Sequence, residues 1–210
     1  MRRAKRRAET VAQIKSLALQ QLSKVGGAGL NLRAIARELE MSSAGIYRYY
    51  ESRDELLIAL ITDGFDSLGA DLRQASGDDS RDPNHLLVDL LVAYRAWALG
   101  SPHLFVLLFT DPVPGFVALE DGPTTPAVRR ALAPLTSAAA RAIDPTWPVH
   151  NADQNEPFPS HVFGGMLRTW SVVHGFVSLE LFHHLDWADT DLDAEFDRLL
   201  TQLVESFRAV

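Results

Sequence analysis

Residues 42–48 carry side chains that suit contact with a polyanion better than chemical catalysis. Four of them are small, namely Ser42, Ser43, Ala44 and Gly45. Small groups on the leading edge of a helix let its backbone approach the edges of bases. Tyr47 and Arg48 add a phenol and a guanidinium, which can donate hydrogen bonds to phosphates, and Arg48 is long enough for a bidentate contact with guanine. This segment is therefore the first candidate for a binding site.

The sequence offers little for metal or catalytic chemistry. The chain has no Cys, which excludes disulfides, thiolate nucleophiles and Cys-based zinc or iron–sulfur sites. His183 and His184 are adjacent, so on a helix they point to different faces, unlike the two ligands of an HExxH zinc site. No G-x-S-x-G elbow accompanies the seven His residues. We therefore expect no enzyme activity, no metal and no cofactor.

Three short helical patterns position the candidate segment. A first helix is predicted to end at the glycines 26–27. Its apolar residues recur at helical spacing, namely Val11, Ile14, Ala18, Leu22 and Val25. Asn31 is a good cap for a second helix. After a turn at residues 40–42, a third helix is expected over residues 43–49. The basic residues 2–7 ahead of the first helix are expected to form a flexible arm near phosphates or the minor groove.

Two short helices joined by a tight turn describe a helix-turn-helix, and this one spans about residues 32–50. Ala36 is small where the two helices must cross, and Ile35 and Ile46 supply apolar contacts that hold their angle. Of the neighbouring phenols, Tyr50 is expected in the core and Tyr47 at the surface. For Tyr49 both placements remain open.

The charge is divided sharply along the chain. The net charge of the chain is −7. Residues 1–55 hold eleven basic residues (Lys and Arg) and six acidic ones (Asp and Glu), whereas residues 56–210 hold nine basic and twenty-one acidic residues. A basic head on an acidic body can be steered onto a polyanion head-first. The alternative is that the arginines form a solvated tail.

The rest of the chain also reads as helical. Ser52 and Glu55 have the spacing of a capping box, which opens a connecting helix at about 53–75. A polar break at 77–83 follows. Further helices are expected at about 86–100, 103–110, 124–143, 160–185 and 191–207, with irregular stretches at 111–123 and 144–159. Because no alternating pattern bounded by hairpin turns occurs, the fold class is expected to be all-α.

The run LNLRAIARELEMSSAGIYRYYESRDELL resembles the N-terminal signature of TetR-type regulators. The resemblance implies contacts to backbone phosphates from Arg33, Tyr47 and Arg53. It implies contacts at or near base edges from Ser42, Ser43, Ala44, Gly45 and Arg48. Glu40 stands where the family usually has Gly, and a left-handed residue other than Gly costs on the order of 1 kcal/mol. We therefore expect a turn of different shape or a slightly longer helix there.

In this family the C-terminal part holds the effector pocket and forms the dimer. Trp170, His174 and Gly175 resemble the signature of the Trp/His-Gly (WHG) subgroup. Candidate pocket residues are long apolar, aromatic or imidazole side chains, namely Tyr94, Trp97, Phe105, Phe109, Phe116, Met166, Trp170 and His174. Each has an alternative as a core residue, and for His174 a hydrogen-bonded core histidine is the preferred interpretation. An apolar or aromatic effector is favoured, because this half lacks a phosphate-binding loop.

The resemblance implies a DNA-binding domain at residues 1–55 and a ligand-sensing and dimerisation domain at 56–210. The last two predicted helices are long and amphipathic enough to pair with those of a second copy in a homodimer. The expected function is a ligand-responsive repressor that binds a palindromic operator in double-stranded DNA. No secretory signal or membrane span is predicted, so a cytoplasmic location is expected. The rival interpretation is a helical assembly protein whose N-terminal helices bind a protein or an anionic membrane surface.

Overall fold

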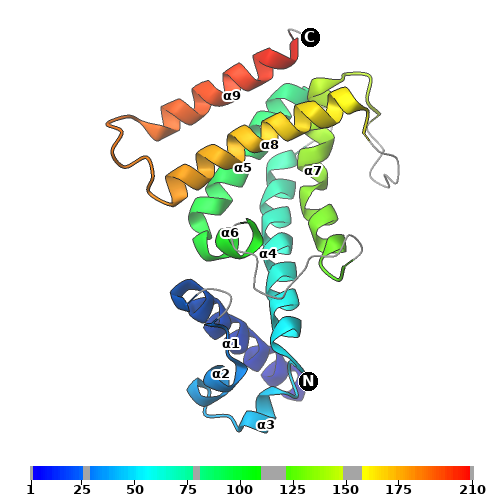
Figure 1. The fold of residues 1–210 in the computed structure, drawn as a ribbon. Helices are drawn as coiled ribbons and strands as arrows, with labels where there is room; N and C mark the ends of the chain where they lie inside the picture. Colours follow the sequence, from blue (N-terminus) through cyan, green and yellow to red (C-terminus); the bar gives the residue numbers. More distant parts are fainter. Residues whose placement is uncertain (1, 26–28, 78–80, 110–121, 149–157, 209–210) are drawn as a thin grey trace. The chain divides into compact units, whose positions relative to one another are not determined.

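The computed structural model describes residues 2–25, 29–77, 81–109, 122–148 and 158–208, and in these residues it contains helices joined by turns and no strand (Figure 1). The expected all-α fold is thereby confirmed. The helices are α1 Arg2–Val25, α2 Leu32–Glu38, α3 Ser43–Ile46, α4 Arg53–Ser76, α5 Pro83–Gly100, α6 Pro102–Phe109, α7 Thr125–Ile143, α8 Ser160–Leu181 and α9 Leu192–Arg208. The glycines 26–27, expected to end the first helix, lie outside the described residues.

The chain forms two compact units. The first consists of Met1–Ser67 with Ser101–Val128, and the second of Leu68–Gly100 with Arg129–Val210. These units follow from packing alone, so the functional division expected at residues 55 and 56 stays a prediction. None of the described helices is by itself long and apolar enough to cross a membrane.

An apolar cluster holds the short helices of the first unit together. Ile14 of α1, Ile35 of α2, Ile46 of α3 and Leu57 of α4 are all fully buried in it. Tyr50 is buried as well, with 6% of its surface exposed, which confirms its predicted core position. Because α3 has only four residues, this shared core rather than helix propensity keeps it in place.

The turn between α2 and α3 keeps a left-handed residue although it has no glycine. Asn31 caps α2 by accepting hydrogen bonds from the backbone N–H groups of Arg33 and Ala34. At the other end Glu40 has φ of +53°, and the Met41 N–H donates to the carbonyl of Ala36 at 2.8 Å. This is a Schellman cap with Glu40 at the left-handed position. The expectation of an altered turn or a longer helix was therefore wrong.

The third helix is shorter than predicted. It spans Ser43–Ile46, and residues 47–49 continue it only as turns. The Arg48 N–H donates to the carbonyl of Gly45 at 3.3 Å, and the Tyr49 N–H to that of Ile46 at 2.9 Å. Tighter turns of this kind are frequent where a helix ends.

The expected N-terminal arm is part of α1, which begins at Arg2. Arg7 lies over the ring of Tyr49 at 5.0 Å, and its Nη1 donates to the carbonyl of Arg48 at 3.5 Å. Lys5 and Glu9 form an i,i+4 pair at 4.0 Å on the same helix. These contacts favour a helix over the flexible arm that the basic composition predicted.

The predicted capping box at the start of α4 is present in modified form. Ser52 Oγ accepts a hydrogen bond from the Glu55 N–H at 3.1 Å. The Glu55 carboxylate accepts from the N–H of Glu51 rather than from that of Ser52. Both contacts satisfy donors that the helix itself leaves without partners, so the sequence located this helix start correctly.

Arg95 ties three helices of the second unit together. Its guanidinium on α5 binds the carboxylate of Glu180 on α8 in a bidentate manner, with Nε donating to Oε2 at 2.7 Å. Its Nη1 lies 2.7 Å from Oδ1 of Asp193 on α9, and the group stacks on the ring of Phe196 at 5.0 Å. The side chains of Arg95 and Glu180 are only 13% and 12% exposed. The hydrogen bond to Glu180 raises the pKa of Arg95, so the guanidinium stays charged.

The helix expected over residues 160–185 ends earlier, at Leu181. His183 has φ of +60°, and the His184 N–H donates to the carbonyl of Leu179 at 2.8 Å. The left-handed residue and this hydrogen bond form a second Schellman cap, which stops the helix before Leu185.

The first prediction concerns the left-handed turn. We expect Glu40→Gly to stabilise the protein by about 0.5 kcal/mol, because relief of the left-handed strain, about 1–2 kcal/mol, exceeds the entropic cost of a glycine, about 0.5–1 kcal/mol. Glu38→Gly, an exposed residue in α2, should instead lower the unfolding free energy by about 1 kcal/mol. Urea denaturation measures both. Destabilisation of equal size in the two variants would contradict the turn assignment.

The second prediction concerns the ion pairs of Arg95. Glu180→Gln leaves the largely buried guanidinium of Arg95 without its main counterion and should lower the unfolding free energy by about 3 kcal/mol. Asp193→Asn removes a carboxylate whose side chain is 84% exposed, and should cost about 1 kcal/mol or less. Chemical denaturation of both variants measures the difference, and equal losses would show that Arg95 does not depend on Glu180.

Candidate nucleic-acid interface

Three residues predicted to contact phosphates surround one hollow of the first unit. Arg33 of α2, Tyr47 after α3 and Arg53 of α4 line a shallow pocket of about 360 Å³ together with the capping residues Asn31 and Ser52. The three belong to different elements, and the packing of α2, α3 and α4 brings them together. The hollow thus combines two guanidinium groups and a phenol at the beginning of α4, which is where a helix favours negative charge.

The burial of these side chains fits a role at the surface. Arg33 is exposed and Tyr47 is 41% exposed, as predicted for that phenol. Arg53 is half-buried and lies 3.8 Å from the carboxylate of Asp54. A hollow that presents donors and remains open to solvent can accept the oxygens of a phosphate.

The four small residues sit at the beginning of α3. Ser42, Ser43 and Ala44 are exposed, and Gly45 is half-buried. Ser42 is the N-cap of α3, and its Oγ accepts a hydrogen bond from the Gly45 N–H at 3.0 Å. A Cβ at position 45 would meet Ser42 Oγ at 3.1 Å, so glycine suits the close approach. Among the four, Ser42 therefore has a structural role that the sequence analysis did not assign.

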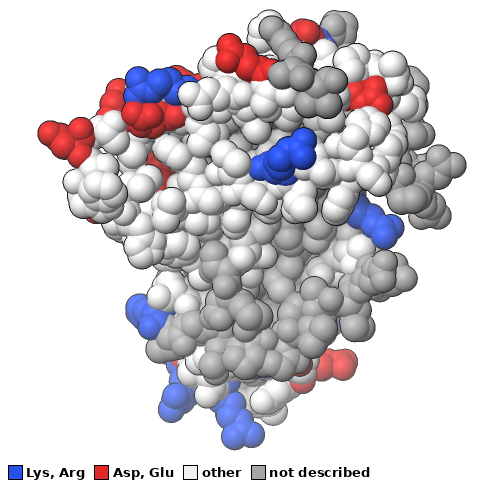
Figure 2. Space-filling view, turned by 45° about the horizontal axis from the view of Figure 1, so that its top comes forward, with Lys and Arg blue, Asp and Glu red and all other residues white. Residues whose placement is uncertain are grey.

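The basic side chain of Arg48 is exposed beside this small-residue edge. Arg7, which the sequence analysis placed in a flexible arm, lies against the same segment through Tyr49 and the Arg48 carbonyl. Sequence reasoning missed this contact, because 41 residues separate Arg7 from Arg48. Figure 2 shows several Lys and Arg side chains along its lower edge, with an acidic side chain at the lower right.

Three of the predicted effector-binding residues form one cluster in the second unit. The Tyr94 hydroxyl lies 2.7 Å from Nδ1 of His174, and the rings of Trp170 and His174 stack at 5.0 Å, as their i,i+4 spacing predicted. Tyr94 is fully buried. Burial raises the pKa of Tyr94 and lowers that of His174, so both groups favour their neutral forms. The preferred interpretation of His174 as a hydrogen-bonded histidine agrees with this geometry.

The other candidates are placed differently. Trp97 is buried and Met166 half-buried in the second unit. Phe105 and Phe109 belong to the first unit, where their rings are 5.5 Å apart. Phe116 lies outside the described residues. The eight residues therefore do not assemble into one described pocket, and their proposed role in effector binding remains a prediction.

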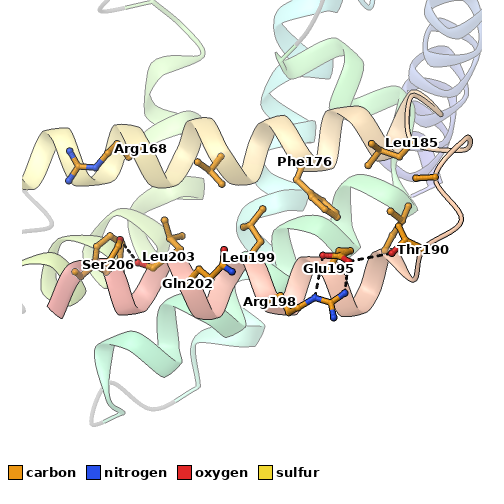
Figure 3. A pocket seen from close by; sticks show the side chains of 14 residues that line it. Arg168, Phe176, Leu185, Thr190, Glu195, Arg198, Leu199, Gln202, Leu203 and Ser206 are labelled. Carbon is orange, nitrogen blue, oxygen red and sulfur yellow. Dashed lines mark hydrogen bonds and ion pairs between the residues drawn. The ribbon is translucent and has the colours of Figure 1, made fainter. Parts of the chain in front are cut away.

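A groove of about 650 Å³ runs between α8 and α9 of the second unit. Phe176 projects from α8 into it, and Leu199 and Leu203 face it from α9 (Figure 3). At one end Arg198 is paired with Glu195. Several apolar residues of α8 are also strongly exposed, namely Phe163, Leu167, Val172 and Leu179. This combination leaves apolar surface of α8 and α9 without a partner in the described chain.

Comparison with known proteins identifies both halves of the chain. The family model "Bacterial regulatory proteins, tetR family" matches residues 14–60, and the model "Tetracyclin repressor-like, C-terminal domain" matches residues 87–203. HTH-type transcriptional regulator Rv1816 of Mycobacterium tuberculosis is 34% identical over 192 residues, which cover 84% of this chain and 82% of that protein.

Solved structures agree. The crystal structure of the regulatory protein SCO4313 matches with 34% sequence identity and a TM-score of 0.77, and the match covers 95% of this chain and 97% of that one. The transcriptional regulator FadR from Bacillus subtilis, solved with stearoyl-CoA, shares the fold at 14% identity and a TM-score of 0.63, over 92% of this chain and 97% of its own. Membership of the Trp/His-Gly subgroup stays a prediction. The family itself is established by these matches: this chain belongs to the TetR family of bacterial DNA-binding transcriptional regulators.

Proposed function

We propose that the chain is a ligand-responsive repressor that binds a palindromic operator as a homodimer. The observation that carries the DNA-binding part is the hollow formed by Arg33, Tyr47 and Arg53, three predicted phosphate contacts that converge from three elements. In this proposal residues 1–55 form the DNA-binding domain, and residues 56–210 sense the effector and form the dimer.

The two kinds of DNA contact have separate roles in the proposal. Arg33, Tyr47 and Arg53 hold the backbone of the duplex and fix the register of α3. The exposed edge of α3, at residues 42–45, then lies against base edges, and Arg48 reaches a guanine. Phosphate contacts supply affinity that falls steeply with salt, whereas base contacts supply sequence preference.

The dimer is proposed to form through α8 and α9. Phe163, Leu167 and Leu179 are 57%, 54% and 45% exposed on α8, which is a large apolar exposure for one helix. The same helix also lines, together with α9, a groove whose side chains are mainly apolar (Figure 3). A second copy can cover this surface with the same surface of its own, as the two-fold symmetry of a palindromic operator requires.

The effector is proposed to bind in the C-terminal domain and to favour a conformation in which the two α3 helices no longer match successive major grooves. Tyr94, Trp170 and His174 support this role, because an aromatic cluster with one polar hydrogen bond can recognise an aromatic or apolar molecule. FadR, which shares the fold, was solved with stearoyl-CoA.

The third prediction tests the DNA contacts. The operator duplex is first selected from a random library, and affinities are then measured by fluorescence anisotropy at several salt concentrations. Arg33→Ala should weaken binding to all duplexes alike and reduce the slope of log K against log salt by about 1. Arg48→Ala should cost about 1–3 kcal/mol on the selected duplex and relax the preference at one base pair.

Arg37→Ala provides the matched control, because Arg37 is exposed on α2 but does not line the hollow. Its salt slope should stay close to that of the unmodified protein. Equal effects of Arg33→Ala and Arg37→Ala would remove the hollow from the interface, and failure to enrich any duplex would refute the DNA-binding proposal as a whole.

The fourth prediction tests the dimer. Leu167→Glu combined with Leu179→Glu places charges on the proposed interface, and should convert a dimer into a monomer because burying an unpaired charge is unfavourable. Val92→Glu, at a similarly exposed position of α5, should leave the dimer intact. Sedimentation velocity measures the mass of each variant. A monomeric unmodified protein, or dimers of both variants, would disprove this interface.

A further inference from the structure

Arg141 is a buried cation without a counterion in the described part of the second unit. It lies in the last turn of α7, and only 8% of its surface is exposed. Its Nε has no hydrogen-bond partner, and no ion pair reaches it among the described residues. A buried charge without partners is strongly unfavourable, so such groups are normally paired or bind something.

Other arginines of the same unit show the usual solution. Arg95 binds the carboxylates of Glu180 and Asp193, and Arg198 pairs with Glu195. Arg198 is far more exposed than Arg141, and it still has a carboxylate beside it. Among the described residues, the more exposed Arg95 and Arg198 therefore have carboxylate partners, whereas the more buried Arg141 has none.

The acid nearest to Arg141 in the sequence is committed elsewhere. Asp144 accepts hydrogen bonds from the N–H and the hydroxyl of Thr146, at 2.9 Å and 2.6 Å, and its other oxygen lies 3.3 Å from His161. The C-terminal end of α7 offers Arg141 the negative pole of a helix, which is a partial charge and does not replace a counterion.

The surroundings of Arg141 along α7 are apolar. The neighbouring positions are short and buried, namely Ala138, Ala139, Ala140 and Ala142. On the next helix in sequence, Gly165 is packed so closely that a Cβ there would meet the Ile143 side chain at 2.7 Å. Arg141 therefore lies among buried apolar side chains of α7, next to the more exposed polar segment that begins at Asp144.

We propose that Arg141 is the anion-binding group of a site for an organic monocarboxylate with an apolar body. One guanidinium matches one carboxylate, which it binds with two parallel hydrogen bonds. Burial excludes a macromolecular anion, and the lack of a second cation at this point disfavours a phosphate ester with two charges. The inference rests on the proposed sensing role of the C-terminal domain and narrows the apolar or aromatic effector to an acid.

The fifth prediction compares acids with their neutral counterparts. Thermal unfolding of the full chain is measured with octanoate and benzoate, and with octanamide and benzamide at equal concentration. At least one acid should raise the unfolding temperature where its amide does not, because binding to the folded state stabilises it. Arg141→Met should remove that shift, and Arg141→Lys should weaken binding about tenfold, because lysine cannot make the bidentate contact.

A ligand-free measurement makes the test independent of the acids chosen. Arg141→Met should unfold at a higher temperature than the unmodified protein, because it removes an unpaired buried charge while keeping the side-chain volume. Arg129→Met, at an exposed position of the same helix, is the control and should change little. An unfolding temperature of Arg141→Met at or below that of the control, or an acid shift that persists in Arg141→Met, would overturn the proposal.

Operator binding separates this inference from the proposed function. Arg141→Met should bind the selected duplex with unchanged affinity and should no longer be released by the acid. If no acid stabilises the unmodified protein more than its amide while DNA binding is intact, the carboxylate site is refuted and the DNA-binding role stands. If an acid binds through Arg141 without weakening DNA binding, the site stands and ligand-responsive release is refuted.

Discussion

The angle between α2 and α3 is the constraint on which the DNA-binding surface depends. Two features hold it: the left-handed backbone at Glu40, and the buried contact of Ile35 and Ile46 in the core of the first unit. With four residues, α3 makes too few hydrogen bonds of its own to persist without that core. The exposed side chains of Arg33 and Tyr47 share one hollow because this packing is fixed.

Two arginines of the second unit illustrate different uses of a buried charge. Arg95 loses solvent but gains two carboxylates and an aromatic ring, so it joins α5, α8 and α9. Arg141 loses more solvent and gains no described counterion. The first arrangement makes a rigid joint, and the second leaves electrostatic free energy that a bound anion can recover. A domain that senses a ligand needs a stable helix arrangement, and it also needs a side chain whose interactions change when the ligand binds.

Helix α8 is apolar on more than one side. Val162, Val173 and Val177 are fully buried within the chain, whereas Phe163 and Leu167 are more than half exposed. Within the chain α8 packs against α5, α7 and α9, and these contacts leave Phe163 and Leu167 exposed. This exposed apolar side has no cover among the described residues and is consistent with a partner beyond the chain, and the groove between α8 and α9 exposes further apolar side chains.

Local signals in the sequence determined the class of the fold, most helix starts and the position of the helix-turn-helix. Asn31 and Ser52 cap their helices as predicted, because a cap depends on residues two or three positions away. Tertiary packing decided the rest. It holds Glu40 in a left-handed conformation, orders α1 from Arg2 through the contact of Arg7 with Tyr49, and pairs Arg95 with Glu180 across 85 residues. It also leaves Arg141 without a described counterion, and since burial and pairing arise only when distant segments meet, no local pattern encodes them.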